Sequence, residues 1–195
     1  MSARRSDIGG GERGMTMLEV LITLVILMVG LLGLASLQAR MQLLQMETYQ
    51  RTQAAVLLQM MTDQIGTNRI NALDYVTAQP LGTGQPLQDC SGQQGAARHL
   101  CQWSNLLLGA AEVHDGERLG AMLGARGCVI NVEPEMPRKF MVAVVWQGMT
   151  PTAAPEGTTC GQGQYGDDRL RRAAVSLVRI GCLQNDPDTG ACVTP

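Results

Sequence analysis

An uncharged apolar run constrains this chain more than any other feature. From Val20 to Ala39 the sequence contains no Asp, Glu, Lys or Arg. A run of about 20 apolar residues spans a hydrocarbon core of about 30 Å as a single helix. It exceeds the apolar region of a cleavable secretory signal, which is about 7 to 15 residues long. We therefore predict one membrane-spanning helix near the N-terminus.

The orientation of this helix follows from its flanking charges and from the cysteines. Arg4, Arg5 and Arg13 precede the run, whereas Arg40 and Arg51 follow it. Because basic residues favour the cytoplasmic side, this small excess places the short N-terminus in the cytoplasm. All the cysteines follow the run, and disulfides are typical of oxidising compartments. Both observations predict that the longer part lies outside the cytoplasm.

The chain has six cysteines, and all of them are candidates for disulfides: Cys90, Cys101, Cys128, Cys160, Cys182 and Cys192. None forms a C-x-x-C motif, and neither His99 nor His114 gives a zinc-finger spacing with them. Many connectivities are open to six cysteines. The entropy of loop closure weakly favours short loops, hence Cys90–Cys101 and Cys182–Cys192. That choice leaves Cys128–Cys160.

Glu19 places a carboxylate at the start of the apolar run. One interpretation is that it reaches the lipid headgroups and marks the beginning of the span, where a charge costs less than at the bilayer centre. The other requires a cut after Gly14, which would give Met15 a new amine and make Glu19 the fifth residue. Residues four apart share a helix face. Because an unpaired charge in a low dielectric is costly, such a carboxylate would register against a terminal amine, its own or a neighbour's.

The segment "GMTMLE", Gly14 to Glu19, resembles the class III signal of type IV pilins and pseudopilins, whose pattern is Gly, usually Phe, then Thr, Leu, Ile, Glu. Met15, Met17 and Leu18 replace Phe, Leu and Ile and keep the apolar character. The resemblance implies that a prepilin peptidase cuts between Gly14 and Met15 on the cytoplasmic face. It also implies N-methylation of Met15 and assembly registration by Glu19.

A helical pattern continues beyond the membrane segment. Apolar or small residues recur at three- and four-residue spacing, namely Leu37, Met41, Leu44, Thr48, Ala54, Leu58, Met61 and Ile65. This spacing predicts an amphipathic helix, and no proline occurs before Pro80. We expect one spine helix from about Met15 to about Thr67, with Gly66 and Asn68 as the stop. Gly30 and Gly33 within it favour either close helix packing or local unwinding.

The distal half predicts a small α+β head. Residues 73–101 are polar and rich in Gly, Gln and Pro, which is typical of a loop, and Ser104 is expected to open a short helix. Three strands are predicted, "CVINVE" from Cys128, "FMVAVVWQ" from Phe140 and "AAVSLVRI" from Ala173, the first two forming an antiparallel hairpin. The predicted fold is α+β, a long N-terminal helix with a transmembrane and an amphipathic half, packed on a small antiparallel sheet. This plan resembles the type IV pilin fold.

The predicted organisation is a leader at 1–14, a transmembrane segment at 15–39, an amphipathic helix at 40–70 and a periplasmic or extracellular head at 71–195. The motifs "AVVWQGMTPTAAP", "CGQGQYGDDRLRR" and "VSLVRI" resemble the PilV group of minor pilins, the type IV pilus modification proteins. That resemblance implies a low-abundance subunit that primes pilus assembly and lies near the filament tip. The implied partners are prepilin peptidase, other minor pilins, the major pilin and the inner-membrane assembly platform.

Other chemistry has weaker support in the sequence. The net charge is −2, and the basic run Arg169, Arg171 and Arg172 follows Asp167 and Asp168, so no nucleic-acid partner is expected. Together with Asp186 and Asp188, these aspartates lack the spacing of an EF-hand. We expect no metal, cofactor or catalytic residue.

Two alternatives stay open at this point. One is a minor pseudopilin of a type II secretion system, which shares the leader. The other, of a different class, is a periplasmic enzyme with an ordinary signal, cut near Ala39 or retained as an anchor.

Overall fold

The structure is a computed structural model that describes residues 16–109, 113–114, 117–118, 122–134, 138–182, 184–185 and 192–194. Gly14 and Met15, the two predicted processing residues, lie outside this described part. The chain divides into two compact units, one ending at Leu44 and the other covering Gln45–Pro195. Each unit is described by itself below.

The predicted spine helix is present as α1, Met17–Thr67, and it runs without interruption through Gly30 and Gly33. It ends beside the predicted stop at Gly66 and Asn68. Its buried residues all belong to the second unit and recur every three or four positions: Gln50, Ala54, Leu57, Met61 and Ile65. Ala54, Met61 and Ile65 are buried as predicted, whereas Leu57 is buried and Leu58 packs beside it. The earlier members of the predicted pattern, Leu37, Met41, Leu44 and Thr48, are exposed, and Gln50, which was not predicted, is buried.

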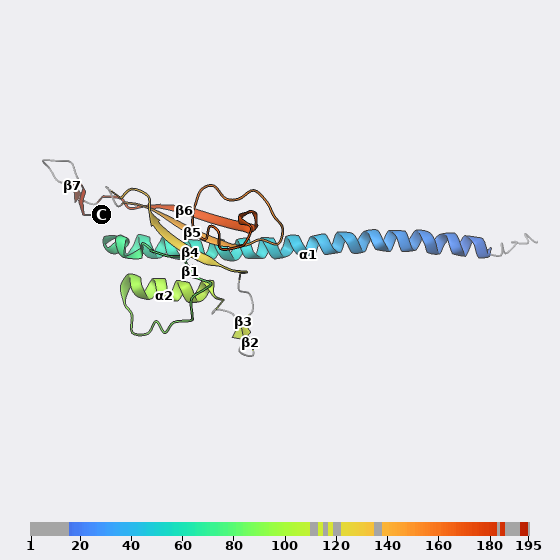
Figure 1. Cartoon of the computed structure of the whole chain (residues 1–195), viewed down its shortest axis with the longest axis horizontal. Coiled ribbons are helices and arrows are strands. Elements are labelled where there is room, and N and C mark those ends of the chain that lie inside the picture. The colour runs from blue at the N-terminus through green and yellow to red at the C-terminus, as the bar shows by residue number, and fades with distance from the viewer. Residues whose placement is uncertain are drawn as a thin grey trace, which may run out of the picture. The chain divides into compact units, whose positions relative to one another are not determined.

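An antiparallel sheet of four strands packs against this part of α1 (Figure 1). Its order is β1 (Leu81–Gly82), β4 (Arg126–Asn131), β5 (Lys139–Gln147) and β6 (Arg171–Arg179). The three longer strands are those predicted from the sequence, and β4 and β5 form the expected antiparallel pair. The result is the predicted α+β arrangement, which matches the pilin fold.

The central strand β5 separates two cores because its side chains alternate between the two faces of the sheet. Phe140, Val142, Val144 and Trp146 face the core shared with α1. Ala143 and Val145 face a second, smaller core with Cys160 and Tyr165. Since both faces are covered there, β5 reads as an almost continuous apolar run.

Helix α2, Gly95–Leu107, corrects two predictions. Its first half, residues 95–101, falls in the segment 73–101 that was expected to be a loop, and Ser104 lies in its last turn instead of opening it. Its start carries no side-chain cap at Gln94, so the usual signal for a helix N-terminus is missing. The helix ends at Leu107, close to Gly109, whose φ of +83° favours glycine.

Several short elements complete the described part: the 3-10 helices η1 (Arg69–Tyr75) and η2 (Asp168–Leu170), and the strands β2 (Val113–His114), β3 (Glu117–Arg118), β7 (Gln184–Asn185) and β8 (Cys192–Thr194). β2 pairs with β3, and β7 pairs with β8. The sequence patterns predicted none of these elements, because each is too short to show a period.

The disulfides Cys90–Cys101 and Cys128–Cys160 are both formed. The first is a pair that loop closure favoured, and the second is the pair that this choice left. Cys182 is also disulfide-bonded, but the side chain of Cys192, its predicted partner, lies outside the described residues. The first bond holds the start of the 90–101 segment to α2. The second joins β4 to the loop after β5.

Trp103 connects three elements of the second unit, namely α2, the spine helix α1 and strand β4. Its Nε1 donates a hydrogen bond of 3.0 Å to the carbonyl oxygen of Leu57 in α1. The far edge of the indole lies over Gly127 of β4, where a Cβ would overlap the ring and would lie 2.8 Å from Leu107 Cδ1. Only glycine leaves room for the ring at this position.

We predict that Gly127→Ala lowers the free energy of unfolding of the head by about 1–3 kcal/mol, because the added methyl overpacks a close contact. Gly157→Ala is the matched control, since a Cβ there meets nothing within 4 Å. The control should change stability by less than about 0.5 kcal/mol. Denaturant unfolding of the full chain in detergent, followed by Trp fluorescence, measures both variants. Equal stability of the two would contradict the packing role of Trp103.

Candidate functional site

The start of α1 is fixed by a threonine cap. The backbone N–H of Glu19 donates to Thr16 Oγ1 at 3.3 Å and lies 3.0 Å from the carbonyl oxygen of Thr16. The sequence Thr16–Met17–Leu18–Glu19 has the spacing of a capping box, in which a threonine side chain accepts from the N–H three residues later. Sequence reasoning missed this second role for the segment, although the T-x-x-E pattern could have shown it.

The Glu19 carboxylate lies in the first helical turn and is exposed, as are Met17 and Leu18. Among the residues that the structure describes, it has no ion-pair partner. A carboxylate in the first turn interacts favourably with the helix dipole. Glu19 therefore combines a stabilising position in its own helix with a carboxylate that is open to another molecule.

The apolar segment behind Glu19 is exposed on every side. Val29 and Leu32, for example, have 66% and 71% of their surface accessible. The helix contains an 18-residue window with a mean hydropathy of 2.8. A helix that is apolar all round requires a surrounding of lipid or of other helices. By length and composition it can span a membrane.

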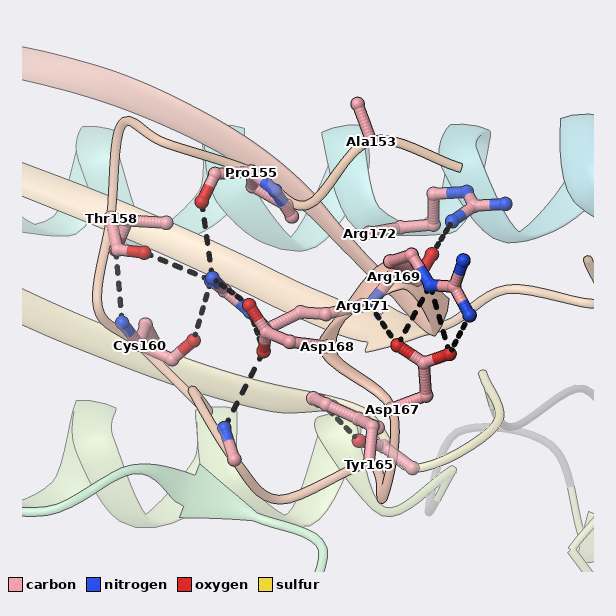
Figure 2. Close-up of polar contacts among 12 residues, drawn as sticks. Ala153, Pro155, Thr158, Cys160, Tyr165, Asp167, Asp168, Arg169, Arg171 and Arg172 are labelled. Atoms are coloured by element: carbon pink, nitrogen blue, oxygen red, sulfur yellow. Dashed lines mark hydrogen bonds and ion pairs between the residues drawn. The ribbon is translucent and has the colours of Figure 1, made fainter. Parts of the chain in front are cut away.

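In the head, Arg171 organises the long loop between β5 and β6 (Figure 2). Its side chain is 1% exposed. Nε and Nη2 donate to the two oxygens of Asp168 at 2.8 and 2.9 Å. The remaining donors reach the carbonyl oxygens of Thr158, Cys160 and Pro155 at 2.9, 3.2 and 3.1 Å. Each of the five guanidinium N–H groups thus has an acceptor.

Two further contacts fix the same loop over the outer face of the sheet. The Cys128–Cys160 disulfide ties it to β4. Tyr165 Oη donates to the carbonyl oxygen of Gly124 at 2.9 Å, and burial raises the pKa of this phenol. The loop is therefore held in a defined position on the head.

Arg172 links this region to the spine helix within the second unit. Its Nη2 donates to Glu47 Oε1 at 2.9 Å and to the carbonyl oxygen of Thr150 at 2.6 Å. The guanidinium fills the space above Gly148, where a Cβ would lie 2.6 Å from Cζ. The contact joins α1, β6 and the loop start.

The predicted acidic and basic clusters are explained by pairing with each other. Asp167 bonds Arg169, and Asp168 bonds Arg171. Hydrogen bonds from these arginines hold the pKa of both carboxyl groups below the ordinary value. Within the described residues, no group of three or more His, Cys, Asp or Glu side chains could hold a metal ion. Asp186 and Asp188 lie outside the described residues.

Of the two histidines, His99 has a side chain in the described part of the chain. His99 Nδ1 lies 2.6 Å from Tyr75 Oη, a phenol whose pKa is raised by burial. This contact packs α2 against η1. The side chain of His114 lies outside the described residues.

Residues 10–35 match the family model described as the prokaryotic N-terminal methylation motif. The match covers the cap, Glu19 and all but the last four residues of the apolar run from Val20 to Ala39. No curated protein and no solved structure matches the chain. The motif supports a type IV pilin or pseudopilin, and it suggests a structural protein rather than an enzyme. With the apolar helix, it also fits a membrane-anchored protein.

We predict that Asp168→Asn lowers the melting temperature of the head at pH 7, because it leaves the buried Arg171 without its counter-charge. The pKa of Asp168 is lower in the folded state than in the unfolded chain, where it is about 3.9. The carboxylate therefore stabilises the fold above that value, and this stabilisation is lost as the pH falls through the folded pKa.

The difference in melting temperature between the native chain and Asp168→Asn should accordingly become smaller as the pH is lowered from 7 to below the folded pKa of Asp168. Asp167→Asn is the matched control, because its partner Arg169 is 66% exposed. An exposed pair contributes little, so the control should lose less at pH 7. A difference for Asp168→Asn that stays constant with pH would contradict the assignment.

Proposed function

We propose that this chain is a minor type IV pilin that is processed between Gly14 and Met15 and assembles through its N-terminal helix. The observation that carries the proposal is the match of residues 10–35 to the N-terminal methylation motif. The long helix packed on an antiparallel sheet supports it. Motility, adhesion or other pilus functions would then belong to the filament.

Processing would prepare the assembly site. Prepilin peptidase would cut on the cytoplasmic face, and Met15 would then carry a methylated amine. Thr16 caps the helix directly after this residue. The new amine and the Glu19 carboxylate would thus flank the first helical turn of the mature chain.

Glu19 would register the subunit against the terminal amine of a neighbour. A carboxylate among apolar helices is costly unless it is paired. Helices stacked out of register would leave both charges unpaired, whereas one register would satisfy them. Glu19 has no ion-pair partner among the described residues, which agrees with this role.

The proposed organisation keeps the leader at 1–14, the transmembrane segment at 15–39, the amphipathic helix at 40–70 and the head at 71–195. Before assembly the chain would be a single-pass inner-membrane protein with the head in the periplasm. The disulfides of the head agree with an oxidising compartment.

The minor role rests on the resemblance of the head motifs to the PilV group. The chain would prime assembly and enter the filament at or near its tip, in contact with other minor pilins, the major pilin and the assembly platform. A minor pseudopilin of a type II secretion system is the second candidate, because the methylation motif is common to both systems.

We predict that Glu19→Gln is inserted and cleaved but supports few or no surface pili. Glutamine keeps a capping-box residue at this position and removes only the charge. Glu19→Ala should give the same assembly defect. Pili counted by electron microscopy, with immunoblots for cleavage, measure the outcome.

Thr16→Ala is the matched control, because it removes the cap and keeps the carboxylate. It should assemble better than Glu19→Gln. Normal piliation by Glu19→Gln would contradict registration by charge, and a defect confined to Thr16→Ala would assign the segment to helix capping alone.

A further inference from the structure

The two edges of the four-stranded sheet differ. On one side, β1 and Thr77 cover the outer edge of β4. The N–H of Thr77 donates to the carbonyl oxygen of Val129 at 3.0 Å, and the N–H of Val129 donates to Thr77 Oγ1 at 3.1 Å. On the other side lies β6, which pairs only with β5 among the described strands (Figure 1). One edge is closed and the other is open.

The register identifies which backbone groups of β6 face outward. The N–H of Gly148 bonds the carbonyl oxygen of Leu170, and the N–H of Ile180 bonds that of Arg138. Both bonds continue the β5–β6 register without a shift. Since bonded and non-bonded pairs alternate in an antiparallel ladder, the even-numbered residues of β6 bond β5. The N–H and C=O groups of Val175, Leu177 and Arg179 therefore point away from the sheet.

The same residues carry exposed side chains. Val175 and Leu177 are 47% and 57% exposed. They share the outer face of the sheet with Met141 of β5, whose cross-strand neighbours are Leu177 in β6 and Ile130 in β4. The loop organised by Arg171 covers this face only around Cys128, Ala143 and Val145. An apolar row thus leads to the open edge.

From Ala173 to Val178 the edge has no proline, bulge or inward charge, which are features that usually prevent strand pairing. The two inward charges of β6, Arg171 and Arg172, lie at its start. At the end of this edge, the positive charge of Arg179 has no counter-charge among the described residues. Arg179 lies opposite Lys139, which pairs with Glu133 at 3.4 Å. Arg179 itself is exposed and has no charged partner in the described part of the chain. An acidic residue on a partner strand opposite Arg179 would offset the repulsion between Arg179 and Lys139.

We propose that the edge of β6 from Val175 to Arg179 docks an extended strand of another protein chain by strand addition. The partner strand is apolar at alternate positions, to lie beside Val175 and Leu177, and acidic opposite Arg179. Main-chain hydrogen bonds provide affinity, and the alternate side chains provide specificity. In the described part of the chain, the C-terminal strands β7 and β8 form their own two-stranded sheet and do not pair with β6.

The proposal rests on the head alone and is independent of N-terminal processing. The test uses the full chain in detergent micelles and the acetylated, amidated peptide Glu-Thr-Val-Thr-Val-Thr. Saturating peptide is expected to slow amide hydrogen exchange at Val175, Leu177 and Arg179. The amides of Ser176 and Val178, which already bond β5, should change little. A peptide with proline in place of both valines is the negative control.

The decisive variant is Val175→Pro. Because the Val175 N–H points outward, proline removes a donor for the partner and leaves the β5 ladder intact. Peptide affinity, measured by isothermal titration calorimetry, should fall by about tenfold or more. Val175→Thr keeps the N–H and is the matched control, with a smaller loss.

Leu177→Lys provides a second route if Val175→Pro fails to fold, because a lysine on the edge opposes pairing. Unchanged exchange at Val175, Leu177 and Arg179, protection at other amides instead, or equal peptide affinity of the native chain and a folded edge variant would each overturn the proposal. These results would leave cleavage at Gly14 and the assembly role of Glu19 unaffected.

Discussion

The head depends on the indole of Trp103, which contacts every layer of its main core. Trp103 belongs to α2, donates its N–H to the carbonyl of Leu57 in the spine helix, and lies over Gly127 of β4. A buried indole N–H usually hydrogen-bonds an acceptor, and for Trp103 a helix carbonyl provides one. This arrangement fixes both the distance between the sheet and α2 and the distance between α2 and α1. Glycine at 127 is required because the ring occupies the place of a side chain.

A second centre, Arg171, stabilises the opposite face of the sheet. Its guanidinium satisfies carbonyl groups of the loop that would otherwise be buried without partners. The disulfide Cys128–Cys160 and Tyr165 bind the same loop to β4 and to Gly124. Both faces of β5 are therefore covered, but only over the half of the sheet that the loop reaches. The uncovered half contains the open edge of β6.

Much of this structure could be predicted from periodicity. The apolar run, the spine helix with Ala54, Met61 and Ile65, and the strands from Cys128, Phe140 and Ala173 all show repeats long enough to recognise. The start of α2 was missed because it has no capping side chain and its first residue is glycine, so the helix was predicted to begin only at Ser104. The role of Arg171 was also missed: the sequence shows three arginines in a short run, and only the fold distinguishes the buried one. The cap at Thr16 was visible in the sequence as a T-x-x-E pattern, but the carboxylate of Glu19 suggested only contact with headgroups or pairing with an amine.

The mature N-terminus tests the central claim most directly, because cleavage creates the amine on which registration by Glu19 depends. Intact mass and N-terminal peptide mass spectrometry of the membrane-purified protein would measure it. The account predicts a chain that begins at Met15 and carries one additional methyl group. A chain that begins at Met1, or near Arg40 after cleavage of an ordinary signal, would contradict it.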